Sequence, residues 1–328
     1  MSRPTHIDPH PPISADGAGL TVVIPVYQRV DQVGETLDSL AAQTVRPGEV
    51  ILVDNGSTDG TLPLLQRRAE EMRRAGWKVR VLTELRSGAA AARQCGLEAV
   101  ESPYVMFFDS DDIMPPTHIA SALRDIATHP DCDLWAWGIG YESAGRHLGS
   151  RRVRPAHLLE NHMVQGLLCT AAYVVRTATI RRAGGWNPNI GGWDDWELGL
   201  RLLLSGARVT VDPAPRLWVR VQESSISGLG YLHRAGDWER TLTAVEQTAS
   251  ADTDPRRRLR LLRLVAYRRV NLAAHYTLEA HPDLGRALLG LALSSPALRR
   301  RHRLLLRMAY LHTSRGLPWA GGIYPNLL

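Results

Sequence analysis

Three aspartates follow a short apolar run, and their types and spacing are those of a metal-binding group. The run at residues 104–108 is continuous and aromatic, which is typical of a buried strand, and Asp109, Asp111 and Asp112 come directly after it. Burying unpaired carboxylates is costly, so they belong at a sheet edge, where oxygen ligands would suit Mg²⁺ or Mn²⁺. A second interpretation stays open, because acids before two prolines can also cap the next helix.

The elements around this cluster must bring further polar groups to it. Strands are expected at residues 20–27, 49–53 and 79–82, and helices at 33–42, 61–75 and 89–100. This alternation predicts an α/β fold with a mostly parallel sheet flanked by helices on both faces. In such sheets, ligands bind beyond the carboxyl ends of the strands. Residues 25–27, Asp54 and Asp109 are all placed at such ends, so we expect them to converge on one site.

The pattern changes after the acidic cluster. Strands are expected at residues 133–141, 167–175 and 208–211, and a helix at 194–204. Beyond residue 228 the strand signals stop, and the chain reads as helical from residue 231, with breaks near 252–255, 281–282 and 294–296. We therefore predict a disordered tail (1–18), an α/β domain (19–228) and an α-helical C-terminal region (229–328).

Charge is distributed unevenly along the 328 residues. The net charge is +6, but residues 256–328 contain 14 Arg against two acids, a local balance of +12. This basic region could contact phospholipid, nucleic acid or an anionic acceptor, or it could be a solvated helical face, which is the commoner case. No apolar run approaches the roughly 18 residues of a membrane span, no secretory signal is found, and the three cysteines lack metal-ligand spacing. We expect a cytoplasmic protein.

Five segments, taken together and in order, resemble the family 2 glycosyltransferases with the GT-A fold. They are TVVIPVY (21–27), VDNGSTDGT (53–61), GAAAARQCGL (88–97), FFDSDD (107–112) and GWDDWELGLRL (192–202). The resemblance covers about residues 20–228, and residues 229–328 resemble no family that we can name. It implies an inverting hexosyltransferase-type enzyme whose Rossmann-like half binds a UDP- or TDP-sugar, with Mg²⁺ or Mn²⁺ as cofactor.

The resemblance also assigns roles to residues of the donor site. It implies that Asp111 binds the metal and that Asp109, in the same DXD motif, faces the ribose or the metal's water shell. Asp54 would accept the N3–H of uracil or thymine, although an Asp before Asn-Gly also suits a turn. Arg93 would reach a phosphate, or would simply be a surface helix residue. The predicted donor site comprises Pro25, Val26, Tyr27, Arg29, Asp54, Arg93, Asp109 and Ser110.

A second acidic pair would supply the base. By the same resemblance, Asp195 is the candidate that removes the acceptor proton, and its place at a helix start favours the ionised carboxylate. The alternative is that Asp194 and Asp195 only cap this helix. Trp193, Asp194 and Trp196 are candidates for acceptor contact, although core packing explains the tryptophans equally well.

The segment 220–227 departs from the family pattern. Gln222 stands where the family often has a metal- or phosphate-binding His, so it is a weaker candidate ligand. The Gln-x-x-Arg-Trp signature of processive members is absent, which favours transfer of one sugar per encounter. The alternative function is a non-catalytic nucleotide-sugar or carbohydrate-binding protein on the same fold.

Several partners remain open at this point. The acceptor could be a glycan, a glycolipid precursor, a natural product or a peptide, and no nucleic acid partner is predicted. The C-terminal helices could mediate homo-oligomer formation or peripheral contact with the inner membrane face.

Overall fold

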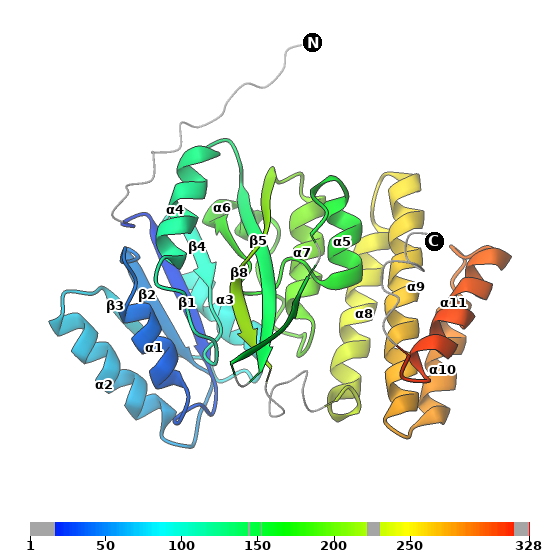
Figure 1. Ribbon diagram of the computed structural model, residues 1–328, viewed down its shortest axis with the longest axis horizontal. Coiled ribbons are helices and arrows are strands. Elements are labelled where there is room, and N and C mark those ends of the chain that lie inside the picture. Colours follow the sequence, from blue (N-terminus) through cyan, green and yellow to red (C-terminus); the bar gives the residue numbers. More distant parts are fainter. Residues whose placement is uncertain (1–16, 144, 152, 222–229, 318–327) are drawn as a thin grey trace, which may run out of the picture.

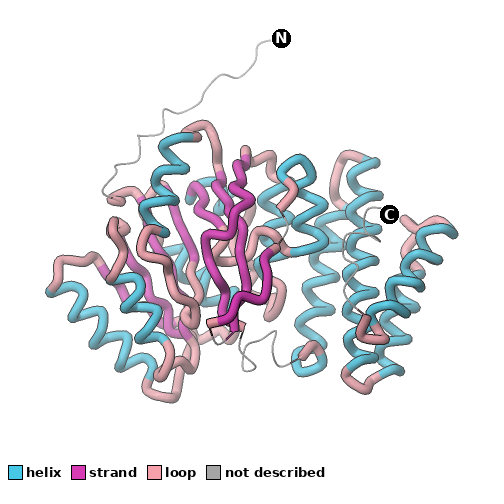
Figure 2. The backbone as a smooth tube through the Cα atoms, viewed as in Figure 1, coloured by secondary structure: helices cyan, strands magenta, loops and turns pink. Residues whose placement is uncertain are grey.

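The computed structural model describes residues 17–143, 145–151, 153–221, 230–317 and 328. Within these ranges the chain forms an eight-stranded sheet between two layers of helices, and a group of further helices packs beside it (Figure 1). Figure 2 shows the strands gathered in the sheet domain and the C-terminal part built of helices alone. The predicted α/β class and the helical C-terminal region are confirmed.

The sheet is parallel in its first half and mixed in its second. β1 (Leu20–Val26) pairs in parallel with β2 (Glu49–Asp54) and β4 (Tyr104–Phe107), and β2 with β3 (Val79–Thr83). β7 (Tyr173–Arg176) runs antiparallel to β4 and to β5 (Leu134–Ser143). β5 also pairs with β6 (Arg146–Ser150), antiparallel, and with β8 (Val209–Arg220), parallel. The order is β3-β2-β1-β4-β7-β5-β6, so the carboxyl ends of β1, β2 and β4 lie together at one edge.

Each face of the sheet has its own helices and its own apolar core. On one face, Val22 and Ile24 of β1 belong to a core shared with α1 (Val33–Ala41), α2 (Thr61–Arg74) and α4 (His118–Thr128). On the other, Val23 belongs to a core shared with α3 (Ala89–Ala99), α6 (Thr177–Arg182) and α7 (Asp194–Leu204). Burial on both faces explains why the central strands are continuously apolar rather than alternating.

The C-terminal region consists of α8 (Ala235–Ser250), α9 (Pro255–Leu278), α10 (Pro282–Leu293) and α11 (Arg300–Thr313). The gaps between these helices fall at the three predicted breaks. α9 begins with Pro255 at its first position, and the Asp254 carboxylate accepts hydrogen bonds from two N–H groups of its first turn. No helix among the described residues is long and apolar enough to span a membrane.

A third core crosses the predicted boundary between residues 228 and 229. It joins Met163 of α5 (Leu158–Gln165) and Leu200 of α7 to Leu242 of α8 and Leu264 of α9. The helical region therefore packs directly on the sheet domain, and the division into domains stays a prediction. At the other end, the Gly17 carbonyl accepts hydrogen bonds from Leu20 and Gly48, so Gly17, which was expected in the tail, is tied to the sheet domain.

Two predicted strands have different bounds. The strand expected at 167–175 begins only at Tyr173, because the Cys169 carbonyl accepts the N–H of Ala172 and closes a turn. The strand expected at 208–211 continues to Arg220, with register shifts on either side of the pair formed by Gly138 and Pro215. The α5 helix, β6 and the 3₁₀ turns at Pro155–His157 and Leu232–Arg234 were not predicted.

Close contact between α3 and the sheet depends on Gly96. A Cβ at this position would lie 2.3 Å from Val23 Cγ1 and 3.3 Å from Val53 Cγ2. We expect Gly96→Ala to lower the free energy of unfolding by about 1–3 kcal/mol through overpacking. Gly34→Ala, in α1, is the matched control, because no atom lies within 4 Å of its added Cβ. Its expected effect is neutral or stabilising by up to about 1 kcal/mol. Chemical denaturation measures both, and equal effects would contradict the close-contact account.

Candidate active site

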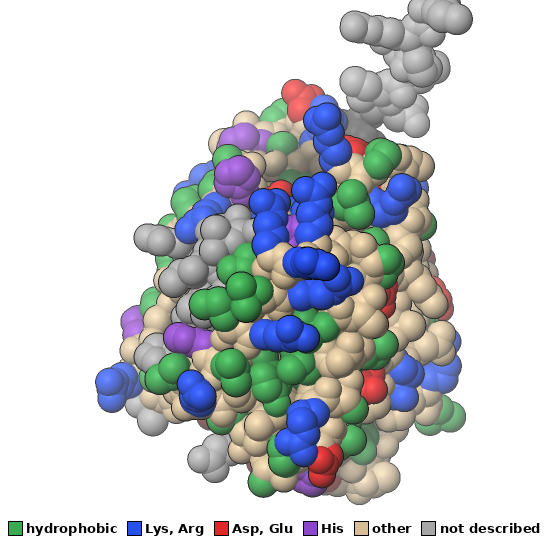
Figure 3. Space-filling model, turned by 90° about the vertical axis from the view of Figure 1, so that its right-hand side faces the viewer, with side chains coloured by type: hydrophobic (Ala, Val, Ile, Leu, Met, Phe, Trp, Pro, Cys, Tyr) green, Lys and Arg blue, Asp and Glu red, His purple; other side chains and the backbone are tan. Residues whose placement is uncertain are grey.

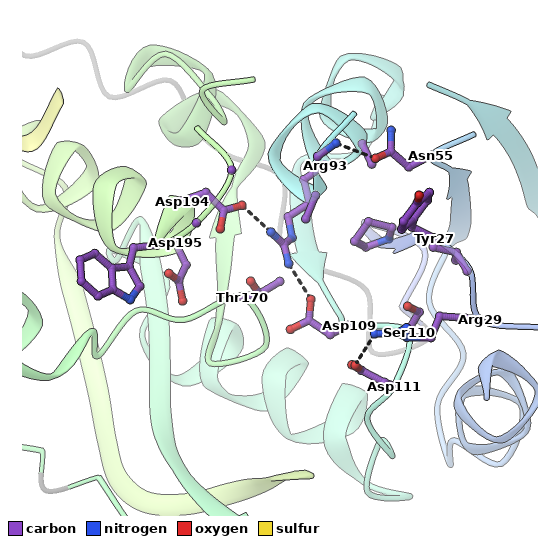
Figure 4. A pocket seen from close by; sticks show the side chains of 18 of the residues that line it. Tyr27, Arg29, Asn55, Arg93, Asp109, Ser110, Asp111, Thr170, Asp194 and Asp195 are labelled. Carbon is purple, nitrogen blue, oxygen red and sulfur yellow. Dashed lines mark hydrogen bonds and ion pairs between the residues drawn. The ribbon is translucent and has the colours of Figure 1, made fainter. Parts of the chain in front are cut away.

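A cavity of about 660 Å³ opens at the carboxyl edge of β1, β2 and β4. Loops after these strands form one side, and the starts of α3 and α7 form the other (Figure 4). The cavity lining includes the predicted site residues Pro25, Val26, Tyr27, Arg29, Arg93, Asp109, Ser110, Asp111, Trp193, Asp194 and Asp195. The structure therefore brings together residues from four of the five sequence segments, with Asn55 representing the fifth.

Arg93 links the two acidic groups of the cavity. Its guanidinium lies 2.7 Å from Asp109 Oδ1 and 2.5 Å from Asp194 Oδ2, and its side chain is only 8% exposed. It also packs over the Trp186 ring, 4.9 Å from the centroid. Burial opposes its charge, but the two carboxylates more than offset that and raise its pKa. Arg93 is thus a buried cation at the centre of the site, and not a surface helix residue.

Asp109 and Asp111 lie on the loop after β4 and face the cavity. Arg29 Nη2 lies 3.3 Å from Asp111 Oδ2, and both side chains are about one-quarter exposed. Burial and the neighbouring Asp109 raise the pKa of Asp111, while Arg29 opposes this. Two adjacent carboxylates repel one another, so the pair is suited to bind a divalent cation. Oxygen atoms of the substrate would complete the coordination shell of that cation. Among the described residues, no group of three His, Cys, Asp or Glu side chains could form a complete protein cage for a metal.

Asp112 does not cap the following helix. α4 begins at His118 with Thr117 at the N-cap, and Asp112 Oδ1 instead accepts the N–H of Arg220 at the end of β8. Its side chain is buried, and burial together with nearby Asp109 raises its pKa to about 8. The capping interpretation is therefore wrong for this cluster, and Asp112 ties the loop to the sheet.

Asp54 occupies the end of β2 below the cavity, not on its lining. Its Oδ2 accepts the N–H groups of Gly56 and Ser57, both at 3.1 Å, which is the turn role that the sequence left open. Its Oδ1 is buried and has no hydrogen-bond partner. A buried acceptor without a donor is costly. Asp54 is 1% exposed and does not line the cavity, so its contact with a nucleotide base stays a prediction.

Asp194 and Asp195 open α7, directly after Trp193, which has a left-handed backbone (φ 53°). Asp194 is held by Arg93, whereas Asp195 forms no ion pair with any described residue. The Asp195 carboxylate accepts the N–H of Trp196, 2.7 Å away. Burial and the adjacent Asp194 raise the pKa of Asp195 to about 6, while Arg151 and Arg93 oppose the shift. A carboxylate with this pKa is ionised at neutral pH and still basic enough to accept a proton.

The two tryptophans of this segment have different surroundings. Trp196 is 1% exposed, and its indole N–H donates to the Met163 carbonyl, so its predicted role in acceptor contact is wrong. Trp193 lines the cavity, and its ring centroid lies 4.8 Å from that of Trp238. The Arg268 guanidinium lies 4.4 Å from the Trp193 ring centroid. Trp196 is thus a core residue, and Trp193 is a residue of the cavity lining.

The C-terminal region supplies one wall of the cavity, although the sequence did not single out the residues that form it. This wall is formed by Tyr231, His233, Arg234 and Trp238. Glu279 at the end of α9 holds it, accepting the N–H groups of Tyr231 and Leu232, both at 2.8 Å. These residues lie beyond the family resemblance, so no motif could have indicated them. Gln222 lies outside the described residues.

The chain is similar in sequence to known glycosyltransferases. The pattern of the family described as Glycosyl transferase family 2 matches residues 21–182. An uncharacterized glycosyltransferase of Escherichia coli, YibD, is 34% identical over 115 residues, which is 35% of this chain and 32% of the relative. The matches to curated relatives generally span well under half of their length.

Two solved structures share the fold over nearly the whole chain. One is S. aureus TarS 1–349 in complex with UDP-GlcNAc (TM-score 0.68, 19% identity, 94% of this chain and 90% of that chain). The other is the mannosyltransferase PcManGT from Pyrobaculum calidifontis in complex with GDP-Man and Mn²⁺ (TM-score 0.58, 20% identity, 91% and 86%). At these identities the structures are evidence of fold alone. Motifs, family match and fold agree: residues 21–182 belong to glycosyltransferase family 2, and the chain has the GT-A fold.

Proposed function

We propose that this protein is an inverting glycosyltransferase that moves one sugar from a UDP- or TDP-sugar to a hydroxyl or other nucleophile of an acceptor. The observation that carries the proposal is the arrangement of two separate acidic groups around one cavity. Asp109 and Asp111 lie at its strand-end side, and Asp195 lies at the start of α7. Nucleotide sugars bound to two fold neighbours support a donor of this class.

The donor would bind across the ends of β1, β2 and β4. The unpartnered Asp54 Oδ1 would accept the N3–H of uracil or thymine, a donor that cytosine lacks. Asp111, with Asp109, would hold Mg²⁺ or Mn²⁺, which stabilises the negative charge of the departing diphosphate. Arg93 is committed to two carboxylates, so we assign it a positioning role in place of direct phosphate binding.

Asp195 would act on the acceptor. Its carboxylate would remove the proton of the attacking hydroxyl, which approaches the anomeric carbon from the face opposite the leaving group. Trp193 and the C-terminal wall would bound the space for the acceptor. The acceptor's identity, the oligomeric state and the cellular location stay predictions.

The base assignment predicts a defined loss of activity. Asp195→Asn should lower kcat for transfer by about 100- to 10,000-fold, the usual contribution of a general base, with UDP affinity unchanged. Transfer is measured from a panel of UDP- and TDP-sugars to mixed acceptors, and binding by calorimetry. Transfer near the wild-type rate would refute Asp195 as base. Nucleotide binding without turnover in either form would favour the non-catalytic alternative.

The pKa of Asp195 predicts the pH dependence. Only the ionised carboxylate accepts a proton, so kcat/KM should fall about tenfold per pH unit below pH 6 and level off above it. Asp194→Asn removes the like charge that raises this pKa, so the fall should move to lower pH. Asp131→Asn, an exposed carboxylate outside the cavity, should leave the profile unchanged. If the pH profile of Asp194→Asn is not shifted, the negative charge of Asp194 does not raise the pKa of Asp195.

Donor binding predicts nucleotide and metal selectivity. UDP and TDP should bind at least about tenfold more tightly than CDP, because a hydrogen bond to a buried carboxylate contributes about 1.5–3 kcal/mol. Mn²⁺ should strengthen UDP binding, and Asp111→Asn should remove most of this gain. Calorimetric titration with and without Mn²⁺ tests both points. Failure of UDP and TDP to bind under either condition would overturn the proposed donor site.

A further inference from the structure

The C-terminal helices carry an outward surface that the proposed reaction does not use. Figure 3 looks at the right-hand side of Figure 1, and Lys or Arg side chains gather there among hydrophobic ones, with few acids. We call this surface the outer face and define it by ten exposed residues of α10, α11 and the turn after α11, leaving out the Asp283–Arg286 ion pair at the start of α10. They are Leu284, Leu291, Arg300, Arg301, Leu304, Arg307, Met308, Leu311, Arg315 and Leu317.

The outer face follows from the helical period of α11. Its inward residues His302, Leu306 and Ala309 are buried, and the helix packs against α9. Its outward residues recur every three or four positions, so they form one stripe in which arginines alternate with large apolar side chains. Leu304 is 61% exposed, and Met308 and Leu311 are each 48% exposed. Such a mixed apolar and basic stripe is unusual on a surface that stays in water.

Most of the seven arginines of α9 have partners within the chain. Arg257 pairs with Asp252, and Arg269 with Glu246. Arg263 donates to the carbonyls of Ala297 and Leu328, and Arg268 stacks on Trp193 and Trp196. These cations therefore hold the helical region together. Most of the exposed arginines without an ion pair in the described helical region are on α11 and just after it, with Arg256 at the start of α9 as a further one.

The outer face has positive charge that the chain does not neutralise. From residue 284 to 328 the sequence contains seven Arg and no Asp or Glu. Among the described residues, no carboxylate forms an ion pair with Arg300, Arg301, Arg307 or Arg315. A second copy of the chain docking symmetrically by this face would place arginines against arginines, which is unfavourable. The partner must be anionic and must also accept apolar side chains.

We propose that the outer face docks on an anionic lipid bilayer. Lipid phosphates would pair with the α11 arginines, while Leu304, Met308 and Leu311 would enter the boundary between headgroups and acyl chains. Clusters of basic residues on a helix attract anionic membranes, and apolar side chains add to binding in proportion to the area that they bury. Nucleic acid would satisfy the arginines but would leave the leucines in water, so it fits the surface less well.

The test is sedimentation of the full chain with vesicles. The protein should bind phosphatidylcholine vesicles that contain phosphatidylglycerol, should not bind phosphatidylcholine alone, and should be released by high salt. The triple variant Arg300→Gln, Arg301→Gln, Arg307→Gln should weaken binding at least about tenfold. The variant Leu304→Ser, Met308→Ser, Leu311→Ser should also weaken binding clearly. These exposed substitutions should leave circular dichroism and the unfolding midpoint unchanged.

A matched control removes the same charge elsewhere. The variant Arg67→Gln, Arg74→Gln, Arg124→Gln changes exposed arginines of α2 and α4 and should bind vesicles like the wild type. The proposal is overturned if the wild type does not bind anionic vesicles, if it binds neutral ones equally, or if the control loses as much binding. It is also overturned if the α11 variants abolish a dimer or nucleic acid binding while vesicle binding persists.

Discussion

The site depends on the buried cation of Arg93. Arg93 lies in the first half of α3, where it has little access to water, and two carboxylates 85 residues apart in sequence, Asp109 and Asp194, compensate its charge. Removing one partner of a buried pair typically costs about 3–5 kcal/mol, so the loop after β4 and the start of α7 are held in register with one another. The carboxylates proposed to act on the donor and on the acceptor are therefore held at a defined distance from one another before any ligand binds.

Close packing in the surrounding structure positions Arg93 and its two carboxylate partners. Gly96, three residues after Arg93 on α3, lets the helix approach Val23 and Val53, which sets the depth of the guanidinium. Across the cavity, the left-handed Trp193 turns the chain so that α7 starts with Asp194 and Asp195. The helical C-terminal region completes the cavity, so it is part of the site and not an appendage.

The sequence predicted the fold and the cavity well where local patterns determine them. Continuous apolar strands, helix breaks at prolines and acids at strand ends are signals within a few residues of one another. It could not predict the contacts that join distant segments, such as Arg93 with Asp194 or Glu279 with Tyr231. It also could not distinguish Trp196 from Trp193, because their different burial depends on α5 and α8 packing against α7. Long-range packing, and not local propensity, decides these roles.

In the proposed donor site, a nucleoside diphosphate would bind with its base at Asp54 and its phosphates at a divalent metal held by Asp111 and Asp109. A crystal structure of the protein with UDP and Mn²⁺, with the metal located by its anomalous scattering, tests this most directly. The account predicts Mn²⁺ coordinated by Asp111 and the diphosphate, and the uracil N3–H donating to Asp54 Oδ1, which is unpartnered in the present structure. A nucleotide bound elsewhere, or bound in the cavity with Asp54 Oδ1 still unpaired, would contradict it.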